Sequence, residues 1–278
     1  MPGIERTLTA ADGTAIFVTD WLPAADSGAD TAAGGILLMH GLGEHCGRYG
    51  HVARFFNDCG LAVRTYDHRG HGRSGGKRGD VPDSDSMLHD AKMVFDDFAR
   101  QFATPPMLLG HSMGGLLAAR FAAENRSPLS ALILSSPALA VPMSQVQKLL
   151  LKIFEAIAPG YTLSSRLDGR YLSHDPGVNS AVDKDALAHT RISARLMRCM
   201  LTSIEIAHAG AQAMKLPILM VVAGDDHFVD AKGSQVFFGR LPSGTATMHL
   251  YPEMYHEVFN EVDAHRVFED VRSWLQKL

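Results

Sequence analysis

The stretch that decides the fold is residues 107–125, MLLGHSMGGLLAARFAAEN. It begins with a short apolar run, passes through Gly110-His111-Ser112-Met113-Gly114, and continues with the apolar spacing of a helix. This order predicts a strand, a tight turn and a helix. The turn matches G-x-S-x-G, in which a side chain at either glycine collides with neighbouring backbone and the serine takes a strained conformation. Ser112 Oγ is then exposed at a helix N-terminus, where free N–H groups favour a developing negative charge.

Outward from this segment, short apolar runs alternate with helix-period segments, which is typical of a parallel sheet covered by helices on both faces. A hairpin around Asp12-Gly13 comes first, followed by a linker at 24–35. The expected strands are 36–40, 61–67, 107–110, 129–135, 218–224 and 246–251. The expected helices are 50–59, 86–102, 113–125, 232–241 and 257–277.

One stretch breaks this alternation. From Ala140 to about Met214 the pattern is helical and no strand is expected. The sequence therefore predicts one α/β domain, residues 1–139 and 215–278, with an inserted helical cap at 140–214. Within the cap, residues 146–157 place apolar side chains on one helix face. Two interpretations of that face stay open: a helix packed on the body of the protein, or a lid that contacts lipid.

The composition is that of a globular protein. Of 278 residues, 46% are hydrophobic and 20% charged, and the net charge of −4 is spread along the chain. No basic face is therefore expected to bind nucleic acid. Cys46, Cys59 and Cys199 have no C-x-x-C spacing, which argues against a disulfide framework or a zinc site. Without a signal-peptide pattern or a run of about 18 apolar residues, we expect a cytoplasmic protein with no transmembrane span.

The acid and the base that Ser112 needs follow it along the chain. A serine nucleophile requires a base within hydrogen-bond reach and an acid that orients the base, and on turns of this kind the acid precedes the histidine. The strand at 218–224 runs into Asp225-Asp226, and the strand at 246–251 runs into a loop that holds His256. Both loops therefore lie at the carboxyl edge of the sheet, where open α/β sheets bind ligands.

We expect His256 to be the general base and an aspartate to hold its imidazole. The residues alone leave Asp225 and Asp226 open, because adjacent loop carboxylates exchange roles with a small change of backbone path; our choice is Asp226. Asp230 is expected to cap the following helix. Histidines within or beside regular elements are interpreted as structural; they are His111, His249 and His265.

A tetrahedral oxyanion needs backbone N–H donors beside the nucleophile. One donor is expected from the residue after the serine, Met113, and the other from Leu42, in the loop that follows the strand at 36–40. The glycines on either side of Leu42, Gly41 and Gly43, let the backbone approach a substrate closely.

The same loop offers a rival interpretation. A strand, the glycines at 41, 43 and 47, a helix and a second strand ending in Asp67 also outline a dinucleotide-binding βαβ unit. The glycine spacing is looser than G-x-G-x-x-G, and Glu44 puts a negative charge where a pyrophosphate has to sit. Both observations disfavour a nucleotide site.

Four segments of the sequence are informative when they are taken together. They are His40 to Tyr49 (HGLGEHCGRY), Asp67 to Ser74 (DHRGHGRS), Gly110 to Gly115 (GHSMGG) and Tyr255 to Glu257 (YHE). In combination and in this order they resemble the monoacylglycerol lipase and lysophospholipase family of the α/β-hydrolase fold. The resemblance spans the whole expected α/β body, whereas the cap is similar only in its helical character.

The resemblance implies the α/β-hydrolase fold, with a mostly parallel eight-stranded sheet flanked by helices. It implies that Ser112, Asp226 and His256 form a catalytic triad, and the segment from Asp230 resembles the family segment that follows its catalytic aspartate. It also implies a mobile cap over an acyl tunnel and a polar pocket for glycerol near Glu44 and Arg48. No metal and no cofactor are expected.

The expected activity is serine carboxylic ester hydrolysis through an acyl-enzyme on Ser112, on single-chain lipids such as monoacylglycerols or lysophospholipids. Three rivals stay open: a carboxylesterase for short-chain esters, a triad haloperoxidase, and a non-enzymatic binding module of the same fold. Dehalogenases and epoxide hydrolases of this fold use an aspartate nucleophile, and position 112 is serine, so they drop out. The expected partner is a small lipid or ester. Peripheral membrane contact of the cap, and a monomer or a homodimer, are left open.

Overall fold

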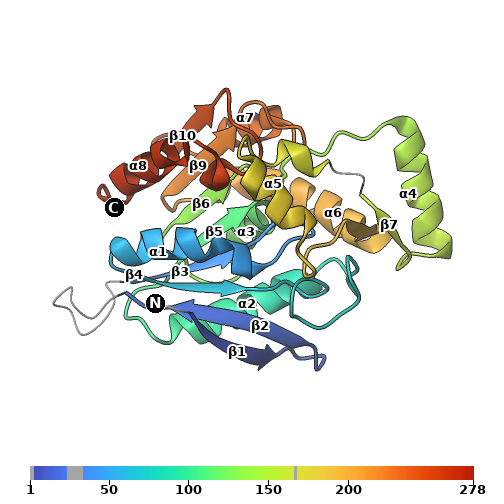
Figure 1. Cartoon of the computed structure of the whole chain (residues 1–278), viewed down its shortest axis with the longest axis horizontal. Coiled ribbons are helices and arrows are strands. Elements are labelled where there is room, and N and C mark those ends of the chain that lie inside the picture. Colours follow the sequence, from blue (N-terminus) through green and yellow to red (C-terminus); the bar gives the residue numbers. More distant parts are fainter. Residues whose placement is uncertain (1–2, 24–33, 166–167) are drawn as a thin grey trace.

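The fold is built on an eight-stranded sheet, shown by a computed structural model that describes residues 3–23, 34–165 and 168–278 (Figure 1). The strand order is β1-β2-β4-β3-β5-β6-β9-β10. β2 is antiparallel to both of its neighbours, β1 and β4, and the remaining strands run parallel to β4. The strands are β1 (Ile4–Thr9), β2 (Ala15–Trp21), β3 (Gly34–Met39), β4 (Leu61–Tyr66), β5 (Met107–His111), β6 (Leu132–Ser135), β9 (Ile218–Ala223) and β10 (Ala246–Tyr251). The predicted mostly parallel sheet is confirmed.

Two groups of helices cover the two faces of this sheet (Figure 1). Ile36 and Leu38 of β3 pack with the first group and Leu37 and Met39 with the second, because successive side chains of a strand point to opposite faces. The first group is α1 (Gly50–Asp58) and α8 (Ala264–Leu275), and the second is α2 (Ser86–Ala99), α3 (Met113–Ala123) and α7 (Ala231–Phe238). Burial on both faces explains why these strands read as continuous apolar runs.

Only residues 34 and 35 of the expected linker at 24–35 can be compared with the structure, because residues 24–33 lie outside the described ranges. Gly34 and Gly35 belong to β3, so the linker prediction was wrong for these two residues. The physical reason is packing: a Cβ on Gly35 would lie 2.5 Å from the Phe102 ring and 2.8 Å from the Phe98 ring. Glycine therefore lets aromatic rings rest directly on the strand. The other expected strands are confirmed with small shifts at their ends.

The segment expected to form a cap is mostly helical, but it also contains a two-stranded antiparallel sheet. The expectation of no strand was wrong, because β7 and β8 are three residues each and too short to show alternation. Its elements are α4 (Gln145–Ile157), β7 (Thr162–Ser164), η3 (Gly169–Tyr171), α5 (Pro176–Asp183), β8 (Arg191–Ser193), α6 (Ala194–Gly210) and η4 (Ala211–Ala213). α6 packs on α3, where Arg120 Nη1 donates to Ser203 Oγ at 3.3 Å. The division into core and cap at 140–214 stays a prediction.

The expected helix at 257–277 was wrong in its first seven residues, since α8 begins at Ala264 and is preceded by a short 3-10 turn, η5 (Val258–Asn260). The buried carboxylate of Glu261 takes hydrogen bonds from backbone N–H groups that surround it. These donors are Tyr255 N at 2.7 Å, His174 N at 3.1 Å and Val262 N at 3.2 Å. Glu257 N donates to Leu172 O at 2.9 Å. These hydrogen bonds give the backbone N–H groups of this region acceptors, so the segment before α8 does not need to form a helix.

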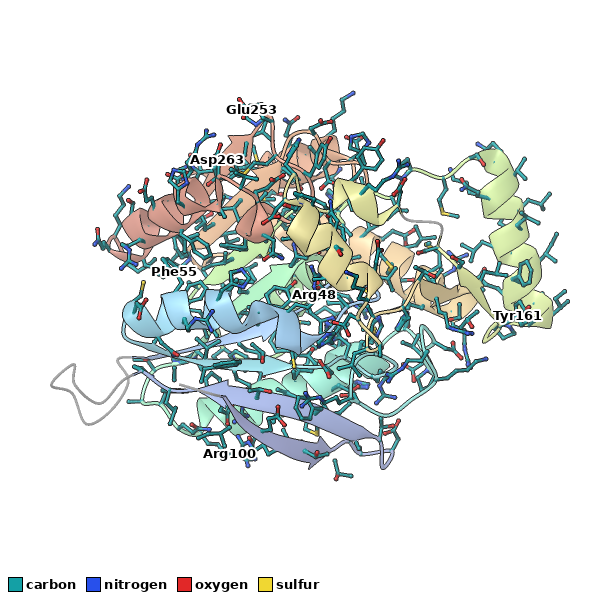
Figure 2. All side chains as sticks on the ribbon, in the orientation of Figure 1. Arg48, Phe55, Arg100, Tyr161, Glu253 and Asp263 are labelled. Carbon is teal, nitrogen blue, oxygen red and sulfur yellow. The ribbon has the colours of Figure 1, made fainter. Side chains whose placement is uncertain are left out.

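Replacing Glu261 by alanine is expected to lower the free energy of unfolding by about 2 kcal/mol, because buried N–H donors lose their acceptor. The matched control is Glu253→Ala, at an exposed glutamate of the preceding loop (Figure 2), which should change stability by less than about 0.5 kcal/mol. Urea unfolding of the two variants measures the difference. Equal stability of both variants contradicts the role given to Glu261.

Within the described part of the chain, no helix is long and apolar enough to cross a bilayer. No cluster of three or more His, Cys, Asp or Glu side chains there is arranged to hold a metal ion.

Candidate active site

Ser112 lies on a strained turn between β5 and α3. Its φ of 52° and ψ of −119° are unusual for a residue with a side chain. A Cβ on Gly114 would lie 2.2 Å from the Met39 carbonyl oxygen, and a Cβ on Gly110 would lie 2.3 Å from the Gly114 carbonyl oxygen. The expected strand, strained turn and helix are confirmed, and both glycines are required by the close approach of backbone.

His256 is paired with Asp226 at the carboxyl edge of the sheet. Asp226 follows β9 and His256 follows β10, and the two strands are parallel neighbours. His256 Nδ1 lies 2.6 Å from Asp226 Oδ2, and both side chains are nearly buried. With Nδ1–H donating to the carboxylate, Nε2 is the ring nitrogen left to exchange a proton with another group.

The Asp226 carboxylate is held in its charged form. Burial by itself raises the pKa of a carboxyl, but the His256 imidazole opposes that effect. Asp226 Oδ1 also accepts hydrogen bonds from the backbone N–H groups of Phe228 at 2.8 Å and Val229 at 3.0 Å. Together these partners hold the pKa of Asp226 below its ordinary value. The carboxylate can therefore orient His256 and stabilise a positive charge on it.

The neighbouring acids lie elsewhere. The Asp225 side chain is 57% exposed and lies 3.3 Å from His227 Nε2 rather than against His256. Asp230 caps α7 by accepting from Lys232 N at 2.9 Å, which confirms the expected cap.

The three histidines set aside by the sequence analysis have different surroundings. His249 lies in β10, 3.4 Å from Asp270, and His265 is exposed in α8. His111 is buried, with its ring 4.8 Å from that of His256. Burial and the neighbouring His256 lower the pKa of His111 to about 4. His111 is therefore a neutral side chain that lies beside the His256 ring.

The loop that carries Leu42, one of the two expected oxyanion donors, reaches the nucleophile. We call residues 41–45 the oxyanion loop. A Cβ on Gly41 would lie 3.2 Å from Ser112 Cβ, so the loop and the serine are in contact. Leu42 and Ser112 line the same cavity. Met113 is the first residue of α3, where backbone N–H groups lack intrahelical partners.

A cavity of about 780 Å³ has Leu42, Ser112 and His256 in its wall, whereas Met113 and Asp226 do not line it. Glu44 and Arg48 contribute polar groups to the wall. Apolar side chains come from the segment expected to form the cap: Leu150, Leu151 and Phe154 of α4, Ile192 of β8, and Met197 and Met200 of α6. The volume lies within the range of sites for single small ligands.

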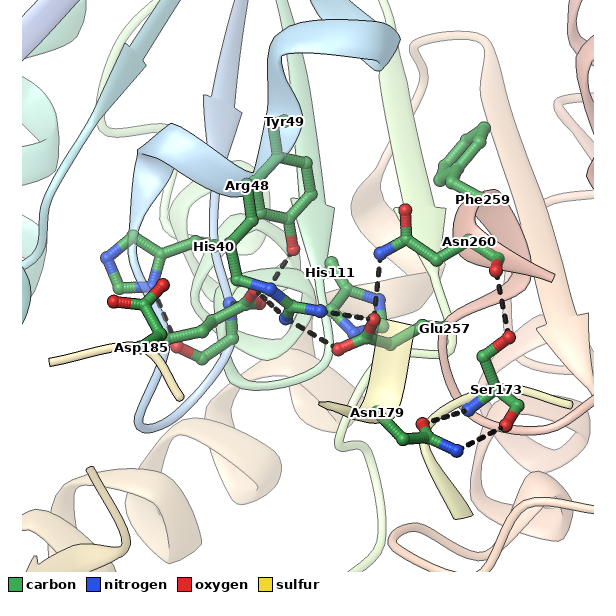
Figure 3. Close-up of polar contacts among 12 residues, drawn as sticks. His40, Arg48, Tyr49, His111, Ser173, Asn179, Asp185, Glu257, Phe259 and Asn260 are labelled. Atoms are coloured by element: carbon green, nitrogen blue, oxygen red, sulfur yellow. Dashed lines mark hydrogen bonds and ion pairs between the residues drawn. The ribbon is translucent and has the colours of Figure 1, made fainter. Parts of the chain in front are cut away.

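Glu257 lines the cavity, but it was not among the site residues predicted from the sequence. Its carboxylate makes a two-pronged ion pair with the Arg48 guanidinium (Figure 3). The same guanidinium also donates a hydrogen bond to Glu44. The only sequence signal is an acid directly after His256. Because Arg48 is 209 positions away, the sequence did not indicate its partner.

Three buried histidines pack together close to the oxyanion loop. His40 Nε2 accepts from His68 N at 2.9 Å, and the His40 ring lies 4.4 Å from that of His68 and 5.4 Å from that of His71. Burial lowers the pKa of all three, and that of His68 and His71 falls well below the ordinary value, with neighbouring imidazoles adding to the effect. The cluster is therefore neutral in the folded protein.

The folded protein should lose stability as the pH falls below about 6.5, the ordinary pKa of histidine in an unfolded chain. Below that pH the unfolded chain binds protons that buried His68 and His71 do not take up, so the free energy of unfolding falls. For two such groups the loss is roughly 2 to 3 kcal/mol between pH 7 and about 5.5. Urea unfolding at a series of pH values measures it.

Two variants test the source of this acid sensitivity. His71→Leu should remove roughly a third of the pH dependence or less, because His68 and His111 also have strongly lowered pKa values and remain. His265→Gln, at an exposed histidine of α8, should leave the dependence unchanged. An unaltered pH dependence in His71→Leu shows that other groups cause the loss.

The fold and the strained serine turn define the class: the chain is an α/β-hydrolase. A family model described as serine aminopeptidase, S33 (Hydrolase_4) matches residues 30–263. The chain is 34% identical over 275 residues to a monoacylglycerol lipase of Mycolicibacterium smegmatis, a match that covers 98% of this chain and 96% of that protein. It therefore belongs to the monoacylglycerol lipase family and is a carboxylic ester hydrolase.

Two further similarities agree with this membership. The crystal structure of a Paleococcus ferrophilus monoacylglycerol lipase matches with a TM-score of 0.83 and 31% identity, covering 94% of this chain and 98% of that chain. The phospholipase YtpA of Bacillus subtilis is 31% identical over 250 residues, covering 88% of this chain and 96% of that protein. The predicted family and fold are confirmed.

Proposed function

We propose that the chain hydrolyses monoacylglycerols, with Ser112 as nucleophile, His256 as general base and Asp226 as the orienting acid. One observation carries the proposal: a single cavity holds Ser112 and His256 between polar groups and apolar walls. A monoacylglycerol has matching parts, because its ester joins a polar glycerol to one apolar chain. The names of the relatives from Mycolicibacterium smegmatis and Paleococcus ferrophilus support the same substrate.

In the proposed reaction, Ser112 Oγ attacks the ester carbonyl carbon and its proton passes to His256 Nε2. The carbonyl oxygen becomes an oxyanion held by the backbone N–H groups of Leu42 and Met113. The intermediate collapses to an acyl-enzyme as His256 returns the proton to the departing glycerol. Water then attacks the acyl-enzyme, again giving a proton to His256, and the fatty acid leaves as Ser112 is protonated.

The chemistry of the cavity wall indicates where the glycerol and the acyl chain of the substrate bind. The end of the cavity near Glu44 and Arg48 is polar and suits the glycerol end of the substrate, whereas the leucine, phenylalanine and methionine side chains suit the acyl chain. A cavity of about 780 Å³ hosts one acyl chain more readily than two.

The test is the hydrolysis rate of glycerol monoesters with short, medium and long acyl chains. The expected result is a rate that peaks at medium or long chains. A rate that falls steadily from the acetyl ester identifies a short-chain carboxylesterase instead. Faster hydrolysis of lysophospholipids than of any glycerol monoester favours the activity suggested by the Bacillus subtilis phospholipase.

We also propose that α4 lies on a lipid surface, from which the cavity takes its substrate. No residue of α4 is buried, and α4 lies at the edge of the molecule (Figure 1). Its apolar side chains are exposed to a large extent: Val146 67%, Leu149 59%, Leu150 47%, Ile153 43% and Ile157 75%. Exposed apolar stripes of this kind mark interaction surfaces. Leu150, Leu151 and Phe154 of the same helix line the cavity.

The test is partitioning of the protein onto phosphatidylcholine vesicles. The double variant Val146→Ser and Leu149→Ser changes two exposed residues outside the cavity wall and should weaken binding about tenfold or more. Val236→Ser, at a 52% exposed valine of α7, should bind like the unaltered protein. Concentration-dependent dimers that dissociate in the double variant, without vesicle binding, indicate that a second copy covers α4 instead.

A further inference from the structure

Three charged side chains of the cavity wall form a buried chain, and Figure 3 labels two of them, Arg48 and Glu257. Arg48 Nη1 donates to Glu44 Oε2 and to Glu257 Oε1, each at 2.7 Å, and Arg48 Nη2 donates to Glu257 Oε2 at 2.7 Å. The side chains of Arg48, Glu44 and Glu257 are only 13%, 8% and 6% exposed. One guanidinium therefore joins two carboxylates that are distant in sequence.

The Glu44 end of this chain is attached to the oxyanion loop. Glu44 Oε1 accepts from Gly41 N at 2.6 Å and from the Tyr49 hydroxyl at 2.7 Å. Gly41 is the residue in contact with Ser112 and the one before the expected donor Leu42. Although burial raises the pKa of a carboxyl, Arg48 and neighbouring groups lower that of Glu44 to about 2. Glu44 is thus a charged acceptor for the backbone at the start of the loop.

The Glu257 end is attached to the loop that carries the general base. Glu257 directly follows His256, and Asn260 Nδ2 donates to Glu257 Oε2 at 2.7 Å. The backbone N–H of Glu257 donates to Leu172 O at 2.9 Å. The position of the Glu257 side chain is therefore coupled to the backbone next to His256.

We propose that Arg48 is a positioning residue, which holds the oxyanion loop and the His256 loop in one mutual geometry through Glu44 and Glu257. The inference rests on the proposed function, in which these two loops act on the same ester. Both N–H groups of Arg48 Nη1 and one of Nη2 are already used by the carboxylates. Most of the hydrogen-bonding capacity of the side chain is thus directed to the protein.

The guanidinium is suited to this task by its shape as well as its charge. Its planar fork matches a carboxylate with two parallel hydrogen bonds, whereas a lysine ammonium provides a point charge without that geometry. Without the positive charge, two buried carboxylates would repel each other and move apart. The oxyanion donor and the base would then move relative to the ester, and a displacement of about 1 Å can cost about a hundredfold in rate.

The experiment compares two esters of the same acyl chain, a monoacylglycerol and a p-nitrophenyl ester, which has no glycerol. In Arg48→Lys, kcat should fall about a hundredfold on both esters, with KM changed by less than about threefold. Glu257→Gln keeps the shape of the side chain and should lower kcat about tenfold on both. This second variant provides the answer if Arg48→Lys does not fold.

The control is Asp97→Asn, which weakens the ion pair of buried Arg64, 2.7 Å from Asp97, on elements that do not line the cavity. It should retain kcat on both esters when circular dichroism shows a folded protein. A rise of KM on the monoacylglycerol alone, with the p-nitrophenyl ester unaffected, overturns the inference and makes Arg48 a glycerol-binding group. An equal loss of kcat in Asp97→Asn also overturns it. Wild-type protein inactive on both esters overturns the proposed function itself.

Discussion

Ser112→Ala is expected to fold normally and to lose nearly all turnover, by about a millionfold, because no other step forms the acyl-enzyme. Alanine accepts the φ of 52° at this position no worse than serine does, so the turn should survive. The backbone at Ser112 is held independently of the side chain, because Ser112 N donates to Ser135 O at 2.9 Å. The measurement is kcat on the best glycerol monoester, with circular dichroism as the check of folding.

A matched serine and a covalent probe make this result specific. Ser130→Ala changes an exposed serine of the β5–β6 connection and should keep full activity. A fluorophosphonate should label the wild-type protein and Ser130→Ala on Ser112, and should leave Ser112→Ala unlabelled. Retained turnover in Ser112→Ala contradicts the proposed mechanism. A wild-type protein that neither turns over nor reacts with the probe supports the binding-module alternative.

Asp226→Asn is expected to lower kcat about ten-thousandfold at neutral pH, the size of loss seen when a triad aspartate becomes a neutral amide. The amide removes the negative charge 2.6 Å from His256 Nδ1. It also lets the side chain donate to that nitrogen, which favours the wrong tautomer of the imidazole. The measurement is kcat over a range of pH on the same ester as for Ser112→Ala.

Asp225→Asn is the natural control, because the residues alone left both aspartates open and the family resemblance favoured Asp226. Asp225 is 57% exposed and lies near His227, so its variant should stay within about twofold of the wild-type kcat. A larger loss in Asp225→Asn than in Asp226→Asn reverses the assignment.

The sequence predicts structure correctly where the physical requirements are local. At the turn around Ser112, neighbouring backbone excludes a Cβ from Gly110 and Gly114, so the requirement is visible as a motif of a few residues. The parallel strands were predicted because burial on both faces demands continuous apolar runs. The N-cap at Asp230 was predicted because a capping side chain bonds to backbone two residues away.

A local sequence pattern predicts the wrong structure where a contact with a distant residue changes the conformation. The pattern at 257–263 is compatible with a helix, but Glu261 and the segment at 172–174 take the backbone donors around it. Gly35 reads as part of a linker until Phe98 and Phe102 pack against it. In both cases the deciding contact comes from residues that a local pattern does not contain.

The sequence by itself therefore predicted the fold class and the candidate nucleophile, base and acid, because each depends on short-range spacing along strand ends. It predicted the family through the resemblance of its motifs. The tertiary structure shows that Asp226, the aspartate chosen from the sequence, faces His256 and that Asp225 does not, and it alone shows that Glu257 binds Arg48 across 209 positions. Such choices depend on side-chain direction and on the folding of distant loops against one another. Hydrogen bonds and ion pairs require that spatial approach, and spacing along the chain does not record it.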